Sequence, residues 1–279
     1  MIILAKRSIG WRGYWQESNF YPWNLAYCGD IDICGWKRPQ SYYRDASLEG
    51  KPGFSFCKTT QSLRSLLNPD KQSWSKWEWH DVVADWTWLQ GRLRSRARKI
   101  NRWKFPYILP AREVELFLNG RSLGKRQTSR DTKFMATWQV AYQPGILKAI
   151  GYTKGKQMAS SQLQTAKQVS KIKLSADRST IKADGQDLSY ITVELTDANG
   201  IRNPKAENLL KFKIEGGTIV GVGNANPVSL ESYQLPQRKA WQGRCLVIVK
   251  SLTGKTGSIT LTASANGISS SKLVMTAVR

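Results

Sequence analysis

The sequence predicts a mainly β protein, in which two β-sandwiches follow an irregular, aromatic-rich segment. Three observations predict this fold class. From residue 113 onward, apolar and polar side chains alternate with the period of two that is typical of half-buried strands. Turns rich in Gly, Asn and Asp separate these runs. Before residue 113, bulky aromatic residues stand among Gly, Asn and Asp without a sustained helical period.

The clearest strand signal is the stretch 113–124, EVELFLNGRSLG. Val114, Leu116 and Leu118 fall on one face of an extended strand, which indicates that this face is buried. Asn119 and Gly120 then supply the two positive φ values that a two-residue primed turn requires. The stretch therefore predicts a β-hairpin.

The hairpin opens a small sandwich that we predict over residues 113–166. Further strands are expected at 134–142, 146–152 and 157–165, and Trp138 is expected in the core. Pro144 and Gly145 suit the central positions of a type II turn. This strand pattern predicts an immunoglobulin-like sandwich.

A second immunoglobulin-like sandwich is predicted over residues 167–279, after a short polar linker at 167–171. The apolar run at 246–249 predicts a buried central strand. The Gly- and Asn-rich loop at 221–227 has no set of carboxylates that would bind calcium. Seven strands are expected, at 171–175, 188–197, 209–215, 218–222, 243–250, 257–265 and 272–277.

The net charge of +23 over 279 residues raises the question of a polyanionic partner. About a third of the excess lies in one stretch without acids, and the other basic residues are scattered, as on solvated β faces. No nucleic-acid-binding motif accompanies the stretch, so nucleic acid is not the expected partner. The stretch contains Arg92, Arg94, Arg96, Arg98, Lys99, Arg102, Lys104 and Arg112.

The four cysteines do not show metal-binding spacing, and the single histidine, His80, has no Cys or His at ligand spacing. We therefore expect no metal site and no cofactor. The spacing of Cys28 and Cys34 permits a disulfide, but buried free thiols are favoured. No apolar run is long enough to span a bilayer, so no membrane partner is expected. The apolar block within residues 1–10 is too short for a signal peptide, and the localisation stays open.

Two aromatic-rich regions can be interpreted in two ways. Aromatic rings among Gly, Asn and Asp are typical of sugar-binding clefts, because a ring stacks on the apolar face of a pyranose. The alternative is that the rings within residues 1–50 fill a core. In the tryptophan-dense stretch 69–90, a sugar platform and packing between domains are the two interpretations, and packing is favoured.

Three segments, in the same order, resemble bacterial β-galactosidases of glycoside hydrolase family 2. They are the run 8–45, which begins SIGWRGYWQESNF, the stretch 74–88 and the EVELFLNG hairpin. The resemblance implies that residues 1–50 are a remnant of the C-terminal end of a (β/α)8 barrel. Residues 51–112 would then be a Trp-rich connector with an anomalous basic stretch. The relatives are often periplasmic or secreted.

The same resemblance implies former substrate-binding positions on the wall of a sugar cleft, at Trp11, Tyr14, Trp15, Asp30 and Trp36. It also implies that the partner of the family is carbohydrate, and it leaves the oligomeric state open. In the C-terminal sandwich, the phrase ADGQDLSYITVELTDANG resembles bacterial immunoglobulin-like domains.

Catalytic residues are not expected in this chain. A retaining glycosidase needs two carboxylates about 5 Å apart. In this family both are glutamates on the fourth and seventh barrel strands, upstream of every matched segment. We therefore expect a C-terminal fragment that is not catalytic alone. The acids of the N-terminal part match neither position: Glu17, Asp30, Asp32, Asp45, Glu49, Glu78, Asp81 and Asp85.

The resemblance breaks off at two places, which leads to a frameshift hypothesis. Residues 1–7 read MIILAKR where the family reads like DYLGEA, and residues 98–111 read RKINRWKFPYILPA where it carries an alternating strand. Both stretches can be back-translated so that a shifted frame restores the family pattern. A truncated, frameshifted gene would make the basic stretch an out-of-frame product. One edge of the small sandwich would then be either unpaired or paired by WKFPYIL. We therefore expect the small sandwich to be only marginally stable.

Two other functions stay open at this point. One is a non-catalytic β-sandwich module that binds carbohydrate or scaffolds a partner. The other is a polyanion binder that acts through residues 92–112.

Overall fold

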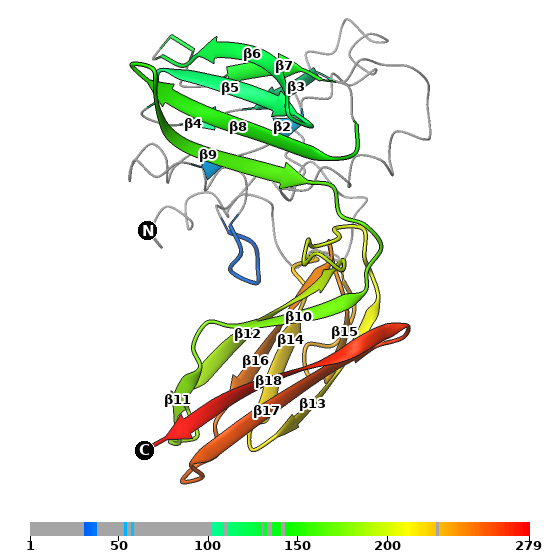
Figure 1. Ribbon diagram of the computed structural model, residues 1–279. Coiled ribbons are helices and arrows are strands. Elements are labelled where there is room, and N and C mark those ends of the chain that lie inside the picture. Colours follow the sequence, from blue (N-terminus) through cyan, green and yellow to red (C-terminus); the bar gives the residue numbers. More distant parts are fainter. Residues whose placement is uncertain are drawn as a thin grey trace, which may run out of the picture. The chain divides into compact units, whose positions relative to one another are not determined.

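The computed structural model describes residues 31–37, 53–54, 57–58, 102–105, 107–108, 111–129, 131–132, 136–140, 143–226 and 229–279 (Figure 1). Every regular element in these ranges is a strand, which confirms the mainly β fold. Apart from 31–37, the predicted barrel remnant lies outside the described residues. No helix within the described part is long and apolar enough to cross a membrane.

The chain divides into two compact units. The central unit is Lys37–Thr165, and the C-terminal unit combines Met1–Trp36 with Ala166–Arg279. The domain boundaries predicted at residues 50, 112 and 166 remain predictions.

The central unit is built on an antiparallel sheet in the order β6-β5-β8-β9. A second sheet has the order β2-β3-β7, and β1 pairs with β4. Buried side chains from β5, β7, β8 and β9 form one core, in which Trp138 is 4% exposed, as predicted. The strands are β1 (Gly53–Phe54), β2 (Cys57–Lys58), β3 (Arg102–Phe105), β4 (Tyr107–Ile108), β5 (Glu113–Leu118), β6 (Arg121–Gln127), β7 (Ala136–Gln139), β8 (Ile146–Thr153) and β9 (Lys156–Gln164).

The predicted hairpin is confirmed in its register and in its turn. Leu118 pairs with Arg121, so the connection has two residues. Asn119 and Gly120 have φ values of 51° and 83°, as a primed turn requires. The apolar face of β5 is buried, and its polar positions are half-buried.

The WKFPYIL stretch contributes strands to the central unit. Residues 102–105 form β3, which lies between β2 and β7 and brings Trp103 opposite Trp138 in the register. Residues 107–108 form β4. Of the two outcomes expected for this sheet, pairing by the WKFPYIL stretch is therefore the one observed. The sequence also predicts that Pro106 is tolerated only at a sheet edge, but this residue lies outside the described ones.

Asn119 connects the hairpin turn to the start of β8. Its backbone N–H donates to the Ile146 carbonyl at 2.8 Å, and its side-chain Oδ1 accepts from the Ile146 N–H at 2.8 Å. Its Nδ2 donates to the Pro144 carbonyl at 3.1 Å. Gly145 has a φ of 137°, and a Cβ added there would lie 1.8 Å from Asn119 Oδ1. Glycine at this position therefore permits the contact between the two turns.

The C-terminal unit is a two-sheet sandwich with an immunoglobulin-like strand arrangement. One sheet has the order β14-β16-β12-β10, and the other has the order β11-β18-β17-β13-β15. A parallel pairing of Lys171 with Ser269 joins them. The strands are β10 (Lys171–Ala176), β11 (Thr180–Lys182), β12 (Leu188–Thr196), β13 (Leu209–Glu215), β14 (Thr218–Gly223), β15 (Gln237–Lys239), β16 (Arg244–Lys250), β17 (Gly257–Ala265) and β18 (Ile268–Val278).

The seven strands predicted for this unit are all present, and β11 and β15 are additional. The apolar run at 246–249 lies in β16, which pairs with β12 on one side and β14 on the other. Cys245, Val247 and Val249 are fully buried in the core. The prediction of a buried central strand is therefore confirmed.

We expect Gly145→Ala to lower the free energy of unfolding of the central unit by about 2–4 kcal/mol. The new Cβ would displace the Asn119 side chain and remove its hydrogen bonds to Pro144 and Ile146. Urea unfolding followed by circular dichroism measures the loss.

Gly155→Ala is the matched control, because Gly155 has a φ of 75° and no atom within 4 Å of an added Cβ. It should cost only the backbone strain, about 1–2 kcal/mol. Equal losses in the two variants would contradict the role given to Asn119.

Candidate functional site

Residues 31–37 form a tight loop that is held by its own aspartate. Asp32 Oδ1 accepts hydrogen bonds from the N–H groups of Cys34 at 2.9 Å and Trp36 at 3.0 Å. The Asp32 N–H donates to the Trp36 carbonyl at 3.0 Å. Gly35 has a φ of 81° and donates to the Asp32 carbonyl. Aspartate and glycine at this spacing therefore fix the loop locally.

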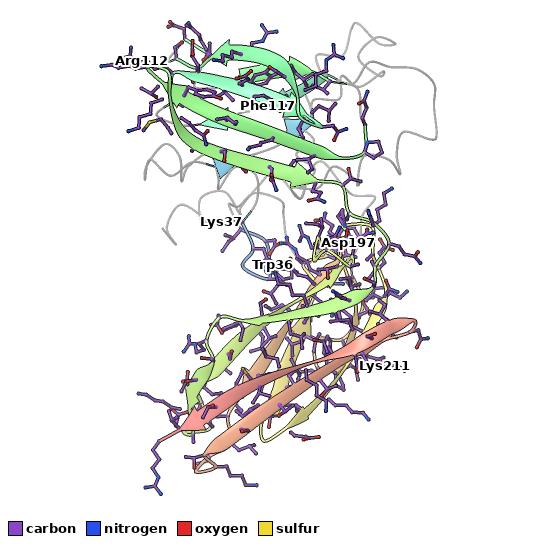
Figure 2. All side chains as sticks on the ribbon, viewed as in Figure 1. Trp36, Lys37, Arg112, Phe117, Asp197 and Lys211 are labelled. Carbon is purple, nitrogen blue, oxygen red and sulfur yellow. The ribbon has the colours of Figure 1, made fainter. Side chains whose placement is uncertain are left out.

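The loop is bound to the sheet of the C-terminal unit that contains β12 and β16 (Figure 2). Arg244 Nη2, on β16, lies 3.3 Å from Asp32 Oδ2. The Arg244 guanidinium also lies 3.9 Å from the centroid of the Trp36 ring, which is a cation–π contact. Trp36 Nε1 donates to Thr192 Oγ1, on β12, at 3.3 Å. We call Asp32, Trp36, Thr192 and Arg244 the Arg244 clamp.

The end of β14 makes room for the loop. A Cβ added to Gly223 would lie 3.2 Å from Cys34 Sγ and 3.7 Å from the nearest carbon of the Tyr233 ring. A side chain at this position would therefore push Cys34 away from the sheet. The loop is therefore held on the sheet by two features: Gly223 leaves space for Cys34, and the charged Arg244 pairs with Asp32.

Burial shifts the ionisation of groups around the clamp. Burial, together with the nearby charge of Arg202, lowers the pKa of Arg244 to about 10, although Asp32 opposes this shift. Arg244 is therefore still protonated at neutral pH. Burial and the Asp32 charge raise the pKa of Cys34 to about 12, and burial raises the pKa of Cys245 well above its usual value. Both cysteines are free thiols and stay neutral, so neither is an activated nucleophile.

Of the five residues predicted on a sugar-cleft wall, only Trp36 lies in the described part. Its ring contacts Arg244, and its Nε1 is used by Thr192. Trp11, Tyr14, Trp15 and Asp30 lie outside the described residues, and the substrate-binding role stays a prediction. Sequence reasoning did not select Asp32 or Arg244 as functional residues. The spacing of Asp32 and Gly35 was a usable turn signal.

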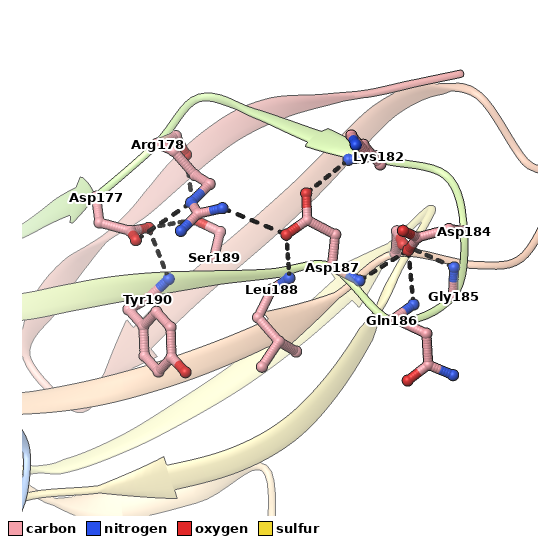
Figure 3. A network of polar contacts seen from close by, with 11 residues as sticks. Asp177, Arg178, Lys182, Asp184, Gly185, Gln186, Asp187, Leu188, Ser189 and Tyr190 are labelled. Carbon is pink, nitrogen blue, oxygen red and sulfur yellow. Dashed lines mark hydrogen bonds and ion pairs between the residues drawn. The ribbon is translucent and has the colours of Figure 1, made fainter.

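A second polar cluster surrounds Arg178, at the end of the sandwich where β11 connects to β12 (Figure 3). Arg178 Nε lies 3.4 Å from Asp177 Oδ2, and its Nη1 lies 3.3 Å from Asp187 Oδ1. Asp177 Oδ1 also accepts from the Tyr190 N–H at 2.8 Å and from Ser189 Oγ at 2.9 Å. We call this group the Arg178 cluster.

In the turn between β11 and β12, beside the Arg178 cluster, carboxylates also accept hydrogen bonds from backbone N–H groups (Figure 3). Asp184 Oδ1 accepts from the N–H groups of Gln186 and Asp187, both at 2.8 Å. Asp187 Oδ2 accepts from the Lys182 N–H at 2.9 Å. The carboxylates of this region therefore serve as acceptors that fix a turn.

The Arg178 cluster does not have the electrostatics of a glycosidase site. A general acid needs a raised pKa so that it keeps its proton near neutral pH. Burial alone would raise the pKa of Asp177, but the Tyr190 N–H, the Ser189 hydroxyl and Arg178 outweigh it and lower the pKa. Asp177 therefore stays ionised. Within the described part of the chain, no group of three or more His, Cys, Asp or Glu residues is placed to bind a metal ion.

Two domain-family models match this chain, one within each unit. Residues 172–274 match the family model described as glycoside hydrolase family 2 C-terminal domain 5. Residues 109–159 match a domain family of unknown function, DUF4982. A glycosyl hydrolase family 2 member from Bacteroides cellulosilyticus has a solved structure that matches with a TM-score of 0.80 and 42% identity. That match covers 98% of this chain and 34% of that chain.

The chain corresponds to the C-terminal region of glycoside hydrolase family 2 proteins. The chain is 34% identical to the β-galactosidase BoGH2A of Bacteroides ovatus over 262 residues, 93% of the chain and 28% of BoGH2A. It is 32% identical over 168 residues to a β-galactosidase of Thermoanaerobacter pseudethanolicus, covering 54% of the chain and 21% of that protein. It therefore spans about a quarter of the length of these curated relatives. The resemblance expected from the sequence is confirmed.

We expect Arg244→Met to free the loop at residues 31–37. Methionine fills similar space but can make neither the ion pair with Asp32 nor the cation–π contact with Trp36. The amides of Cys34 and Trp36 should then exchange with deuterium about 10- to 100-fold faster, as measured by hydrogen-exchange mass spectrometry.

Arg178→Met is the matched control for the exchange measurement, because Arg178 lies in the other polar cluster of the same unit. It should leave the exchange of these amides unchanged. Unchanged exchange in Arg244→Met would show that the Arg244 clamp does not hold the loop.

We expect the C-terminal unit to lose stability below about pH 4. The pKa values of Asp177, Asp184 and Asp197 are lower in the folded chain than their ordinary value of 3.8. Their contribution is present above the unfolded pKa and is lost as the pH falls through the folded pKa. For buried Asp197, the desolvation that would raise the pKa is outweighed by N–H donors from Lys167, Ile201 and Asn199.

Asp197→Asn should reduce the difference in unfolding free energy between pH 6 and pH 3, as measured by urea unfolding, because asparagine does not titrate. The same difference in variant and parent chain would show that Asp197 is not one of the groups responsible.

Proposed function

We propose that the chain is a non-catalytic C-terminal module of a family 2 glycoside hydrolase, and that its C-terminal sandwich holds the loop at residues 31–37 in place. The Arg244 clamp carries this proposal. It joins Asp32 and Trp36 to strands that begin more than 150 residues later in the chain. An ion pair and a ring contact on one guanidinium fix both the position and the orientation of the loop.

The place of the loop in the family supports the anchoring role. By resemblance, residues 31–37 belong to the run that follows the last strand of the catalytic barrel. A sandwich that binds this run would hold the end of the barrel region and would position the aromatic residues that precede it. The sandwich would then contribute rigidity to a sugar cleft without contacting the reacting atoms.

We infer the lack of catalysis by this chain alone from the chemistry that a retaining glycosidase needs. Two carboxylates must face one substrate, one as nucleophile and one protonated. In the described part of the chain, Asp177 and Asp187 lie on either side of Arg178, and Arg178 favours the ionised form of Asp177.

The two relatives described above are β-galactosidases, so a β-galactoside is the substrate we propose for the whole protein.

An activity assay tests the non-catalytic part of the proposal. The purified chain, produced in a host without its own galactosidase, is incubated with an aryl β-galactoside. We expect no release of the aryl group above that of a blank preparation from the same host.

Turnover that copurifies with the chain through two orthogonal columns would overturn the proposal. Anchoring is tested separately by the exchange of the loop amides, so one half of the proposal can fail without the other.

A further inference from the structure

The outer face of the sheet β18-β17-β13-β15 carries a set of aligned lysines. Lys213 on β13 and Lys272 on β18 both pair with Thr262 of the intervening strand β17. Lys211, two residues before Lys213, pairs with Ser264. These positions alternate with Leu210, Phe212 and other core residues, so their side chains point away from the core. We call Lys211, Lys213 and Lys272 the lysine face; Figure 2 labels Lys211.

The charges of the lysine face are exposed and are not neutralised within the described part of the chain. All three lysines are exposed, and none of them forms an ion pair with a described carboxylate. Glu215 also faces outward on β13, two residues from Lys213, and it forms no ion pair with a lysine of the described part. Glu231, near the edge strand β15, is engaged with Arg238 and with the Lys239 N–H.

The register sets the spacing of the three charges. Neighbouring strands lie about 4.8 Å apart, so Lys213 and Lys272, with one strand between them, are about 10 Å apart at the backbone. Lys211 and Lys213 are two residues apart on one strand, or about 7 Å. Thr262 lies between Lys213 and Lys272, and Ser264 lies beside Lys211, whose carbonyl accepts a hydrogen bond from the Ser264 hydroxyl. Such a surface presents cations at intervals with hydrogen-bonding groups in between.

We propose that the lysine face binds an anionic polysaccharide, with carboxylate or sulfate groups spaced along an extended chain. The outward positions of these four strands hold no aromatic ring, so the face lacks the stacking surface that a neutral sugar or an unpaired base would use. A flat sheet face also does not enter the groove of a duplex. Charge and hydroxyl groups are what this surface offers, and an acidic glycan is the partner that they complement.

The lysine face shares no residue with the basic stretch at residues 92–112 or with the Arg244 clamp. It does not depend on the non-catalytic role proposed above, because an active or inactive chain would present the same face. The site would retain the protein on an acidic glycan.

The test uses the whole chain and polygalacturonate as the probe, with affinity measured by biolayer interferometry at low ionic strength. The triple variant Lys211→Gln, Lys213→Gln, Lys272→Gln should bind about tenfold more weakly than the parent chain. The matched control Lys182→Gln, Lys205→Gln, Lys255→Gln removes the same charge from exposed positions of the same unit. It should stay within about twofold of the parent chain.

Equal losses in the two triple variants would overturn the site, because only net charge would then matter. Undiminished binding in the first triple variant would overturn it too. Both variants should show the urea unfolding curve of the parent chain, which excludes a folding defect.

Two further probes test the class of partner. Uncharged galactan should not bind. If galactan does bind the parent chain, and the first triple variant loses this binding, a charge-based site is contradicted. Single-stranded DNA should bind more weakly than polygalacturonate at equal ionic strength. If single-stranded DNA binds more tightly than polygalacturonate, and the first triple variant loses this binding, the partner of the lysine face is a nucleic acid and not a polysaccharide.

Discussion

Arg244 makes the contacts that hold Asp32 and Trp36 on the C-terminal sandwich. It stands on a strand whose neighbours in sequence, Cys245, Val247 and Val249, are fully buried. The pleat of β16 therefore directs Arg244 to the opposite face, where it meets Asp32 and Trp36. The apolar run that builds the core thus also determines where the guanidinium lies. Burial lowers the pKa of Arg244 only to about 10, so its charge is retained at neutral pH.

Three described aspartates of this unit stabilise loops and turns. Asp32, Asp184 and Asp197 each accept hydrogen bonds from at least two backbone N–H groups and thereby fix a loop or turn. Such acceptors favour the ionised form, and the pKa values of Asp184 and Asp197 are lowered accordingly. A glycosidase needs the reverse for one of its two acids. The arrangement of these acids therefore agrees with a module that supports a catalytic region.

Most of the fold could be predicted from the sequence, because alternation with a period of two is a local signal. It located the hairpin at Asn119 and Gly120 and all seven longer strands of the C-terminal unit. β11 and β15 were not predicted, since each has three residues and shows no full alternation. The contacts of the predicted site could not be predicted from the sequence. Trp36 was selected for its aromatic ring, but its partners Arg244 and Thr192 are distant in sequence, and only folding brings them together.

The anchoring of the loop on the sandwich requires that Asp32 and Arg244 are energetically coupled. A double-mutant cycle with Asp32→Asn, Arg244→Met and the double variant measures this coupling directly, from the opening free energies of the Cys34 and Trp36 amides in hydrogen exchange. We expect a coupling of about 1–2 kcal/mol, because Arg244 Nη2 and Asp32 Oδ2 are 3.3 Å apart and both side chains are mostly shielded from water. Additive effects of the two substitutions would contradict it.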